Sequence, residues 1–128
     1  MGEGQVSNSE YVLMKIIWAN QNKAFYSEIV EALEKENFTW KKNTILTFLA
    51  RLVEKKVLAT NKVGRKNEYY ALVSEEEYIA RQTKSFVGRV YEGNVKGLVS
   101  TLIQQDLISS NDLDELQSFW EQRKKIDE

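Results

Sequence analysis

The hydrophobic residues of this chain change their spacing near residue 57, from a helical period to one typical of β-strands. Four apolar residues before that point follow the i, i+3, i+4, i+7 spacing of one helical face, namely Ile45, Phe48, Leu49 and Leu52. Residues 57–63 and 68–73 are strand-like, and the turn-forming residues 64–67 separate them. The pattern therefore predicts a helix that begins near Lys41 and is followed at once by a β-hairpin.

Two further helices are expected before this unit. Ser7 and Glu10 have the spacing of a capping box at the start of a helix over residues 8–20, and a polar turn follows at residues 20–23. A second amphipathic helix is expected over residues 27–35. The order helix, helix, helix, hairpin is that of the winged helix-turn-helix, so we predict such a domain over residues 1–73.

Residues 74–128 form a second predicted domain, a helical arm. Ser74 and Ser109 each begin a capping sequence, and Gly93-Asn94 is expected to interrupt the helical pattern between them. The predicted fold is mainly α with one small β-hairpin. The arm carries more large apolar residues than it can bury alone, so we predict that it is a dimerisation domain. The predicted contact residues are Phe86, Val90, Tyr91, Leu98, Leu102, Leu113, Leu116 and Trp120.

Charge divides the chain in the same way. Residues 1–72 hold 11 Lys and Arg against 8 Asp and Glu, whereas residues 73–128 hold 7 against 11. Between Lys41 and Lys66 there are eight basic residues and a single acid, Glu54. A basic segment that begins with an amphipathic helix and ends in a hairpin indicates a double-stranded DNA-binding surface.

The predicted DNA contacts lie on the polar face of the third helix and at the hairpin tip. An asparagine can pair with adenine, a threonine can offer a methyl group to thymine, and lysine and arginine suit guanine or phosphate. The residues are Lys41, Lys42, Asn43, Thr44, Leu46, Thr47, Arg51, Arg65 and Lys66. A solvated charged helix face is the alternative interpretation, and the three tryptophans are expected to be structural.

Composition excludes several classes of function. The chain has no cysteine and no histidine, which excludes disulfides, thiolate metal sites and histidine-based catalysis. We therefore expect no enzyme, no metal site and no cofactor. There is also no apolar run of membrane-spanning length and no secretory signal, so we expect a cytoplasmic protein that does not contact membranes.

Several segments resemble the penicillinase-repressor family of bacteria. They are residues 9–18 (SEYVLMKIIW), 44–52 (TILTFLARL), 68–73 (EYYALV) and 86–93 (FVGRVYEG), in the same order and with the same spacing. The resemblance covers roughly residues 6–120. It implies a homodimeric repressor of resistance or metal-efflux genes, with winged-helix heads on a TACA…TGTA-type palindrome, entwined C-terminal helices, and release by a signal. Leu46 departs from the basic residue that several relatives carry at this position.

The release signal stays open at the level of sequence. The copper-responsive branch of this family uses a cysteine cluster, which this chain lacks. The β-lactam branch is cleaved in the arm by a sensor protease, and Thr101-Leu102 occupies the matching position here. Two alternative functions are a ligand-responsive regulator with an apolar pocket between head and arm, and a protein–protein adaptor whose basic face meets an acidic partner.

Overall fold

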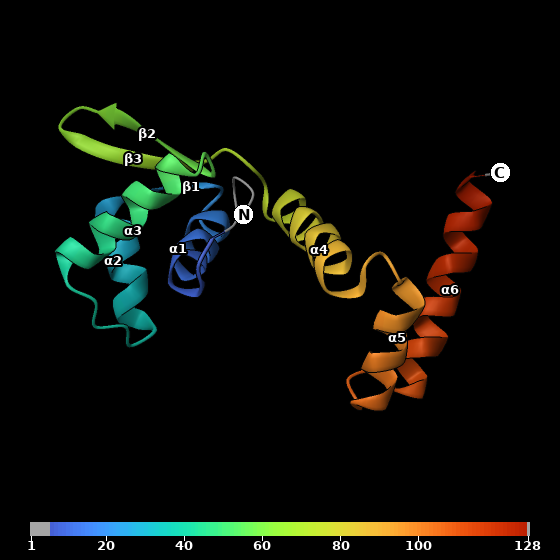
Figure 1. Ribbon diagram of the computed structural model, residues 1–128. Coiled ribbons are helices and arrows are strands. Elements are labelled where there is room, and N and C mark those ends of the chain that lie inside the picture. Colours follow the sequence, from blue (N-terminus) through green and yellow to red (C-terminus); the bar gives the residue numbers. More distant parts are fainter. Residues whose placement is uncertain (1–5, 128) are drawn as a thin grey trace. The chain divides into compact units, whose positions relative to one another are not determined.

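The computed structural model describes residues 6–127, which form six helices and three short strands (Figure 1). These residues divide into two compact units between Gln82 and Thr83. The predicted fold class, mainly α with a small β-structure of the winged-helix type, is confirmed. In chain order the elements are α1 (Asn8–Ala19), β1 (Lys23–Phe25), α2 (Tyr26–Lys35), α3 (Lys42–Glu54), β2 (Leu58–Val63), β3 (Lys66–Ala71), α4 (Glu75–Tyr91), α5 (Val95–Gln104) and α6 (Ser110–Asp127).

All three capping sequences begin helices as predicted. The hydroxyl of Ser7 accepts the Glu10 amide at 3.2 Å, and the Glu10 carboxylate accepts the Ser7 amide at 3.1 Å. The same reciprocal pair joins Ser74 to Glu77 before α4. Before α6 the Ser109 hydroxyl accepts the Asp112 amide at 3.0 Å, and the Asp112 carboxylate accepts the Ser109 amide at 2.9 Å. Each pair satisfies two amides that a helix start would otherwise leave unpaired.

The sheet has one strand more than the predicted hairpin. Its order is β1-β3-β2, with every neighbouring pair antiparallel. The predicted polar turn ends one residue earlier than expected, because Gln21 and Asn22 adopt positive φ and Lys23 already pairs with Tyr70. A strand of three residues is too short to show alternation, which explains why the sequence pattern did not indicate it.

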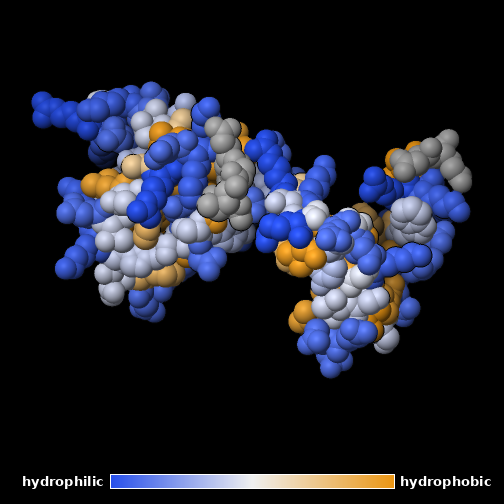
Figure 2. Space-filling model, in the orientation of Figure 1, coloured by the Kyte–Doolittle hydropathy of each residue, from blue (hydrophilic) through white to orange (hydrophobic). Residues whose placement is uncertain are grey.

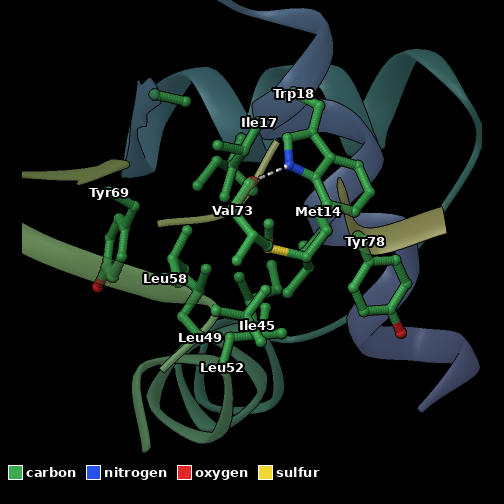
Figure 3. Packing of buried hydrophobic residues seen from close by; sticks show 14 of the residues in the cluster. Met14, Ile17, Trp18, Ile45, Leu49, Leu52, Leu58, Tyr69, Val73 and Tyr78 are labelled. Carbon is green, nitrogen blue, oxygen red and sulfur yellow. Dashed lines mark hydrogen bonds between the residues drawn. The ribbon is translucent and has the colours of Figure 1, made fainter. Parts of the chain in front are cut away.

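The core of the N-terminal unit lies where α1, α2 and α3 meet the sheet (Figure 3). Tyr69 points into it and is 7% exposed, whereas Tyr70 points outward and is 38% exposed, as expected for neighbours on a strand. The indole Nε1 of Trp18 donates to the carbonyl of Val73 at 2.9 Å, in a buried position. This bond ties the segment that follows β3 to α1.

The N-terminal unit extends beyond the domain boundary predicted at residue 73. Tyr78, in the first turn of α4, is buried, and its ring lies 5.9 Å from that of Tyr11 and 5.5 Å from that of Trp18. Lys15 on α1 also pairs with Glu75 at 3.0 Å. These contacts attach the beginning of α4 to the winged-helix core.

The C-terminal unit exposes its apolar residues. No residue between 83 and 126 is buried, although this segment holds eleven large hydrophobic side chains that are exposed in a single chain. Figure 2 shows apolar surface on this part of the chain. No helix within residues 6–127 is both long and apolar enough to cross a membrane.

Candidate nucleic-acid interface

The turn between α2 and α3 sets the start of the exposed helix. Asn37 adopts φ 65°, its amide donates to Glu34 O, and the Phe38 amide donates to Leu33 O at 3.0 Å. This is the Schellman arrangement, which ends α2 and turns the chain into the following helix. The Phe38 ring then packs 4.9 Å from Trp40, which lies 5.3 Å from Phe48 of α3. An aromatic cluster therefore holds the N-terminal end of α3 in place.

Helix α3 has one buried and one exposed face. Ile45, Leu49 and Leu52 are buried in the core. The opposite face carries Asn43, Thr47 and Ala50 at i, i+4, i+7 spacing, and all three are exposed. The helical spacing predicted from sequence thus holds through the whole element.

The predicted contact residues on α3 occupy different parts of its surface. Lys41, Lys42, Thr44 and Arg51 are exposed, as predicted contacts need to be. Leu46 is half-buried and packs against the core, so only part of its side chain is available. The hydroxyl of Thr47 donates to the Asn43 carbonyl at 2.8 Å, which engages the hydroxyl proton and leaves the methyl group and the acceptor lone pairs of the oxygen.

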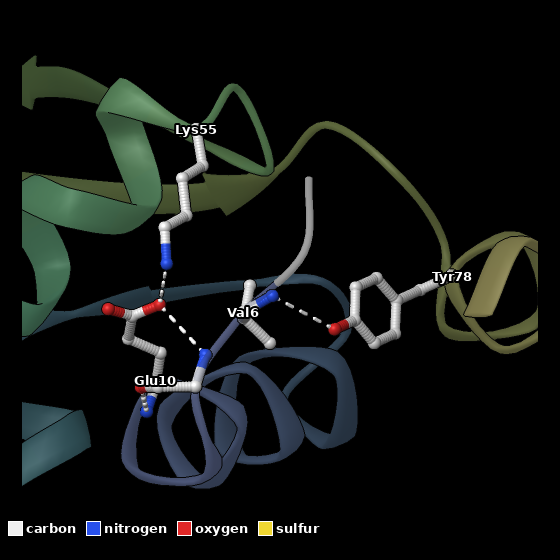
Figure 4. Close-up of polar contacts among 5 residues, drawn as sticks. Val6, Glu10, Lys55 and Tyr78 are labelled. Carbon is white, nitrogen blue, oxygen red and sulfur yellow. Dashed lines mark hydrogen bonds and ion pairs between the residues drawn. The ribbon is translucent and has the colours of Figure 1, made fainter. Parts of the chain in front are cut away.

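A partly buried ion pair fixes the other end of α3 to α1 (Figure 4). Lys55 Nζ lies 2.5 Å from Glu10 Oε1, and the side chains are 33% and 2% exposed respectively. Burial raises the pKa of Glu10, but the hydrogen bonds from Lys55 and Ser7 and the charges of Lys55 and Arg51 lower it, and the net shift of the pKa is downward. Lys55, one of the eight basic residues of the segment, therefore has a structural role.

The wing, residues 58–71, is a hairpin with a two-residue turn at its tip. Val63 pairs with Lys66, and the first turn residue, Gly64, adopts φ 65°, which a type II′ turn requires of a glycine. Arg65 is exposed at the tip, and Figure 2 shows the surface of the wing as hydrophilic. Lys66 Nζ lies 5.7 Å from the centre of the Phe25 ring, so a cation–π contact holds it near the C-terminal end of β1.

A shallow hollow joins the wing to the N-terminal end of α3. It brings together Lys42 and Leu46 of α3 with Arg65 and Lys66 of the wing. The remaining lining residues come from β1, α2 and β3, and they are Phe25, Tyr26, Ser27, Asn67 and Tyr69. Tyr26, Ser27 and Asn67 were not predicted as site residues. Ser27 was assigned only to the start of an amphipathic helix and Asn67 only to the hairpin turn.

The predicted dimerisation residues are partly or fully accessible in one chain. Phe86, Val90, Leu113, Leu116 and Trp120 are exposed, while Tyr91, Leu98 and Leu102 are half-buried. The predicted cleavage position, Thr101-Leu102, lies inside α5, and the Thr101 hydroxyl donates to Gly97 O at 3.0 Å. A protease could reach that peptide bond only after α5 unwinds locally.

The site offers amide, methyl and cationic groups and no catalytic constellation. Among residues 6–127 no group of three or more His, Cys, Asp and Glu is arranged to hold a metal ion. A helix with an exposed polar face, held by a helix-turn-helix and flanked by a basic wing, is the DNA-binding element of winged-helix regulators. The fold and the site therefore define a winged-helix DNA-binding protein.

Comparisons with known proteins identify the family. The penicillinase repressor family model matches residues 6–122, and the chain belongs to this family. The penicillinase repressor of Bacillus licheniformis is 32% identical over 94% of this chain and 92% of its own length. The methicillin resistance regulatory protein MecI of Staphylococcus aureus (strain N315) is 28% identical, over 90% of this chain and 92% of its length. The family consists of DNA-binding transcriptional repressors and not of enzymes.

Solved structures agree with the winged-helix assignment. The solution structure of the DNA-binding domain of the repressor BlaI superimposes with a TM-score of 0.52 at 34% identity, covering 61% of this chain and 94% of that one. The monomeric form of Bacillus licheniformis BlaI, in complex with the blaP half-operator, gives a TM-score of 0.51 at 34% identity over 59% and 90% of the two chains.

Proposed function

We propose that this protein acts in the cytoplasm as a homodimer that represses transcription by occupying a palindromic operator. The observation that carries the proposal is the exposed Asn43–Thr47–Ala50 face of α3 beside a basic wing, in a chain of the penicillinase repressor family. Each head reads one half-site, and the two-fold symmetry of the dimer requires a palindrome.

The contacts divide by chemistry. Asn43 suits an adenine edge and the Thr47 methyl suits a thymine methyl, so these two residues read sequence. Lys41, Lys42, Thr44, Arg51, Arg65 and Lys66 contribute mainly phosphate contacts. The half-buried Leu46 supplies apolar contact.

The hollow between wing and α3 extends this surface. Lys42, Arg65 and Lys66 place three cations around it, and the hydroxyl of Ser27 lies on its α2 side. One backbone phosphate of the half-site fits this chemistry. Because phosphate contacts release condensed counterions, affinity should fall steeply as salt rises.

The arm pairs with a second copy through the predicted dimerisation residues. The support is the exposure of large apolar side chains in a unit that buries none of its residues between 83 and 126. Such surface is unfavourable in water and is removed when two copies associate. Release from DNA then needs only a signal that loosens the arm, because a monomer loses the effective concentration of the second head. A sensor protease that acts at Thr101-Leu102 after α5 unwinds would be such a signal.

Variants separate the two kinds of DNA contact. Arg65→Ala with Lys66→Ala should weaken binding similarly for all duplexes and reduce the salt dependence, whereas Asn43→Ala should weaken operator binding and leave scrambled DNA unaffected. Mobility-shift titrations measure both. A loss for Arg65→Ala/Lys66→Ala that is confined to the operator would refute the assignment to phosphate.

A charge in the arm tests the dimer. Leu116→Glu or Leu102→Glu should convert the protein to monomers, and Gln117→Glu, on the same helix as Leu116 and with the same charge change, serves as the control. Sedimentation equilibrium measures the association. If both leucine variants remain dimeric at micromolar concentration, the proposed interface is wrong.

A further inference from the structure

The middle of α3 carries no charge, although bases lie at both of its ends. Residues 43–50 contain neither an acid nor a base, whereas Lys41 and Lys42 precede them and Arg51 follows them. Part of this stretch is buried in the core, but some of its side chains reach the surface. The bases at the ends suit phosphates, and the uncharged surface between them suits a different part of the DNA.

Methyl groups gather on the exposed side of this stretch. Ala50 follows Leu46 at i+4 and Thr47 at i+3, so the three side chains are neighbours on the helix surface. Thr47 and Ala50 are exposed, and Leu46 is half-buried but lines the hollow beside the wing. The hydroxyl proton of Thr47 is engaged by the Asn43 carbonyl, which leaves the methyl group and the acceptor lone pairs of the oxygen. We call Leu46, Thr47 and Ala50 the apolar patch of α3.

We propose that the apolar patch recognises the C5-methyl groups of pyrimidines in the major groove, so that 5-methylcytosine can replace thymine in the operator. The inference rests on the operator binding proposed above. The C5 methyl is the apolar group that a base edge presents in the major groove, and in 5-methylcytosine it occupies the same ring position as in thymine. The observation that carries the proposal is an uncharged, methyl-bearing helix surface with cations on both sides.

The apolar patch suits the methyl group and not the rest of the thymine edge. Thymine presents the acceptor O4 beside its methyl group, whereas 5-methylcytosine presents the donor N4. While the Thr47 hydroxyl is bound to Asn43, no side chain of the patch can donate to O4, but Thr47 Oγ1 can accept from N4. Burial of one methyl group changes affinity by about fourfold. We therefore expect the methyl group to contribute about this factor on either base.

Duplexes that differ by one methyl group test the inference with the unaltered protein. In one half-site of a TACA…TGTA palindrome, deoxyuridine replaces each thymidine in turn, and mobility-shift titrations should show about fourfold weaker binding at one position or more. At such a position the T·A pair is then replaced by C·G and by 5-methyl-C·G, and the methylated pair should bind about fourfold tighter than the unmethylated one. Full affinity for every deoxyuridine duplex, or equal affinity for the two C·G pairs, would refute the inference. A palindrome that binds no better than a scrambled duplex would refute the proposed operator binding itself.

Substitutions in the patch assign the methyl effect to its residues. Leu46→Ala with Thr47→Ser removes methyl groups and keeps the hydroxyl, so the thymine–uracil difference should fall below about twofold. Thr47→Val keeps a methyl group and should preserve the difference. Lys42→Ala, a phosphate contact in the proposed function, is the control and should weaken binding to all duplexes while the difference stays unchanged. Circular dichroism checks folding, and Thr47→Ser alone, at an exposed position, serves if Leu46→Ala impairs it. An undiminished difference in the folded variants would refute the assignment to the patch.

Discussion

Removing Lys55 should destabilise the N-terminal unit by an amount that depends on pH. Glu10 is 2% exposed, and in Lys55→Met its carboxylate keeps the Ser7 amide as a partner but loses the cation 2.5 Å away. A buried charge without its counter-ion costs about 3 kcal/mol or more. Protonation of Glu10 would remove the unpaired charge. From a usual pKa of 4.5 it costs about 3.4 kcal/mol at pH 7, which offers no relief, but only about 0.7 kcal/mol at pH 5, at about 1.36 kcal/mol per pH unit.

The expected destabilisation of Lys55→Met is therefore about 3 kcal/mol at pH 7 and under about 1 kcal/mol at pH 5. The sign follows from the pKa of Glu10. In the wild type this pKa is lowered, so the pair stabilises the fold above pH 4.5 and that contribution is lost as pH falls through the folded-state pKa. In the variant the pKa should be raised, so the variant loses stability as pH rises.

Urea unfolding of the full chain, followed by tryptophan fluorescence at one protein concentration, measures both values. Lys62→Met, which removes an exposed wing cation, controls for net charge. Glu10→Leu combined with Lys55→Met should recover most of the lost stability, since it leaves no unpaired charge. A Lys55→Met variant that matches the wild type at pH 7, or whose deficit is the same at pH 5, would contradict the role assigned to this pair.

Three further changes test local features. Trp18→Phe should lower the free energy of unfolding by about 2 kcal/mol, because the buried Val73 carbonyl loses its hydrogen-bond donor. An unchanged midpoint of urea unfolding would exclude that hydrogen bond. Gly64→Ala should cost about 1 kcal/mol through the positive φ alone, since no atom lies within 4 Å of the added Cβ; a stabilised variant would contradict the turn. Helix propensity predicts that Gly97→Ala raises the free energy of unfolding by about 1 kcal/mol. We expect no such gain, because the added Cβ would meet the Asn94 side chain at 2.8 Å and disturb the helix cap. A full gain in thermal unfolding would refute this reasoning.

The features that the sequence predicted are those with a local signal. Helices were found by apolar spacing and by capping pairs such as Ser7 and Glu10, and the wing was found by its alternating residues around Gly64. The polar face of α3 followed from the same periodicity, because a helix buries one stripe and exposes the other.

The missed features depend on partners far apart in the chain or on atypical residues. Glu10 meets Lys55 across 45 positions, so the capping motif alone gave no sign of the ion pair. Strand β1 exists because β3 pairs with it, and Ser27 joins the hollow between the wing and α3 only through the fold. The helix ends at Asn37 and Lys56 have positive φ without glycine, so the usual signal for a helix end was absent.

The most direct test of a dimeric operator-binding repressor is a mobility-shift titration against three duplexes at two salt concentrations. The duplexes are a TACA…TGTA palindrome, its isolated half-site and a scrambled sequence. We predict the tightest binding to the palindrome, weaker binding to the half-site and the weakest to the scrambled duplex, with all three falling as salt rises. Equal affinity for the three duplexes would contradict both the sequence reading by α3 and the two-headed dimer.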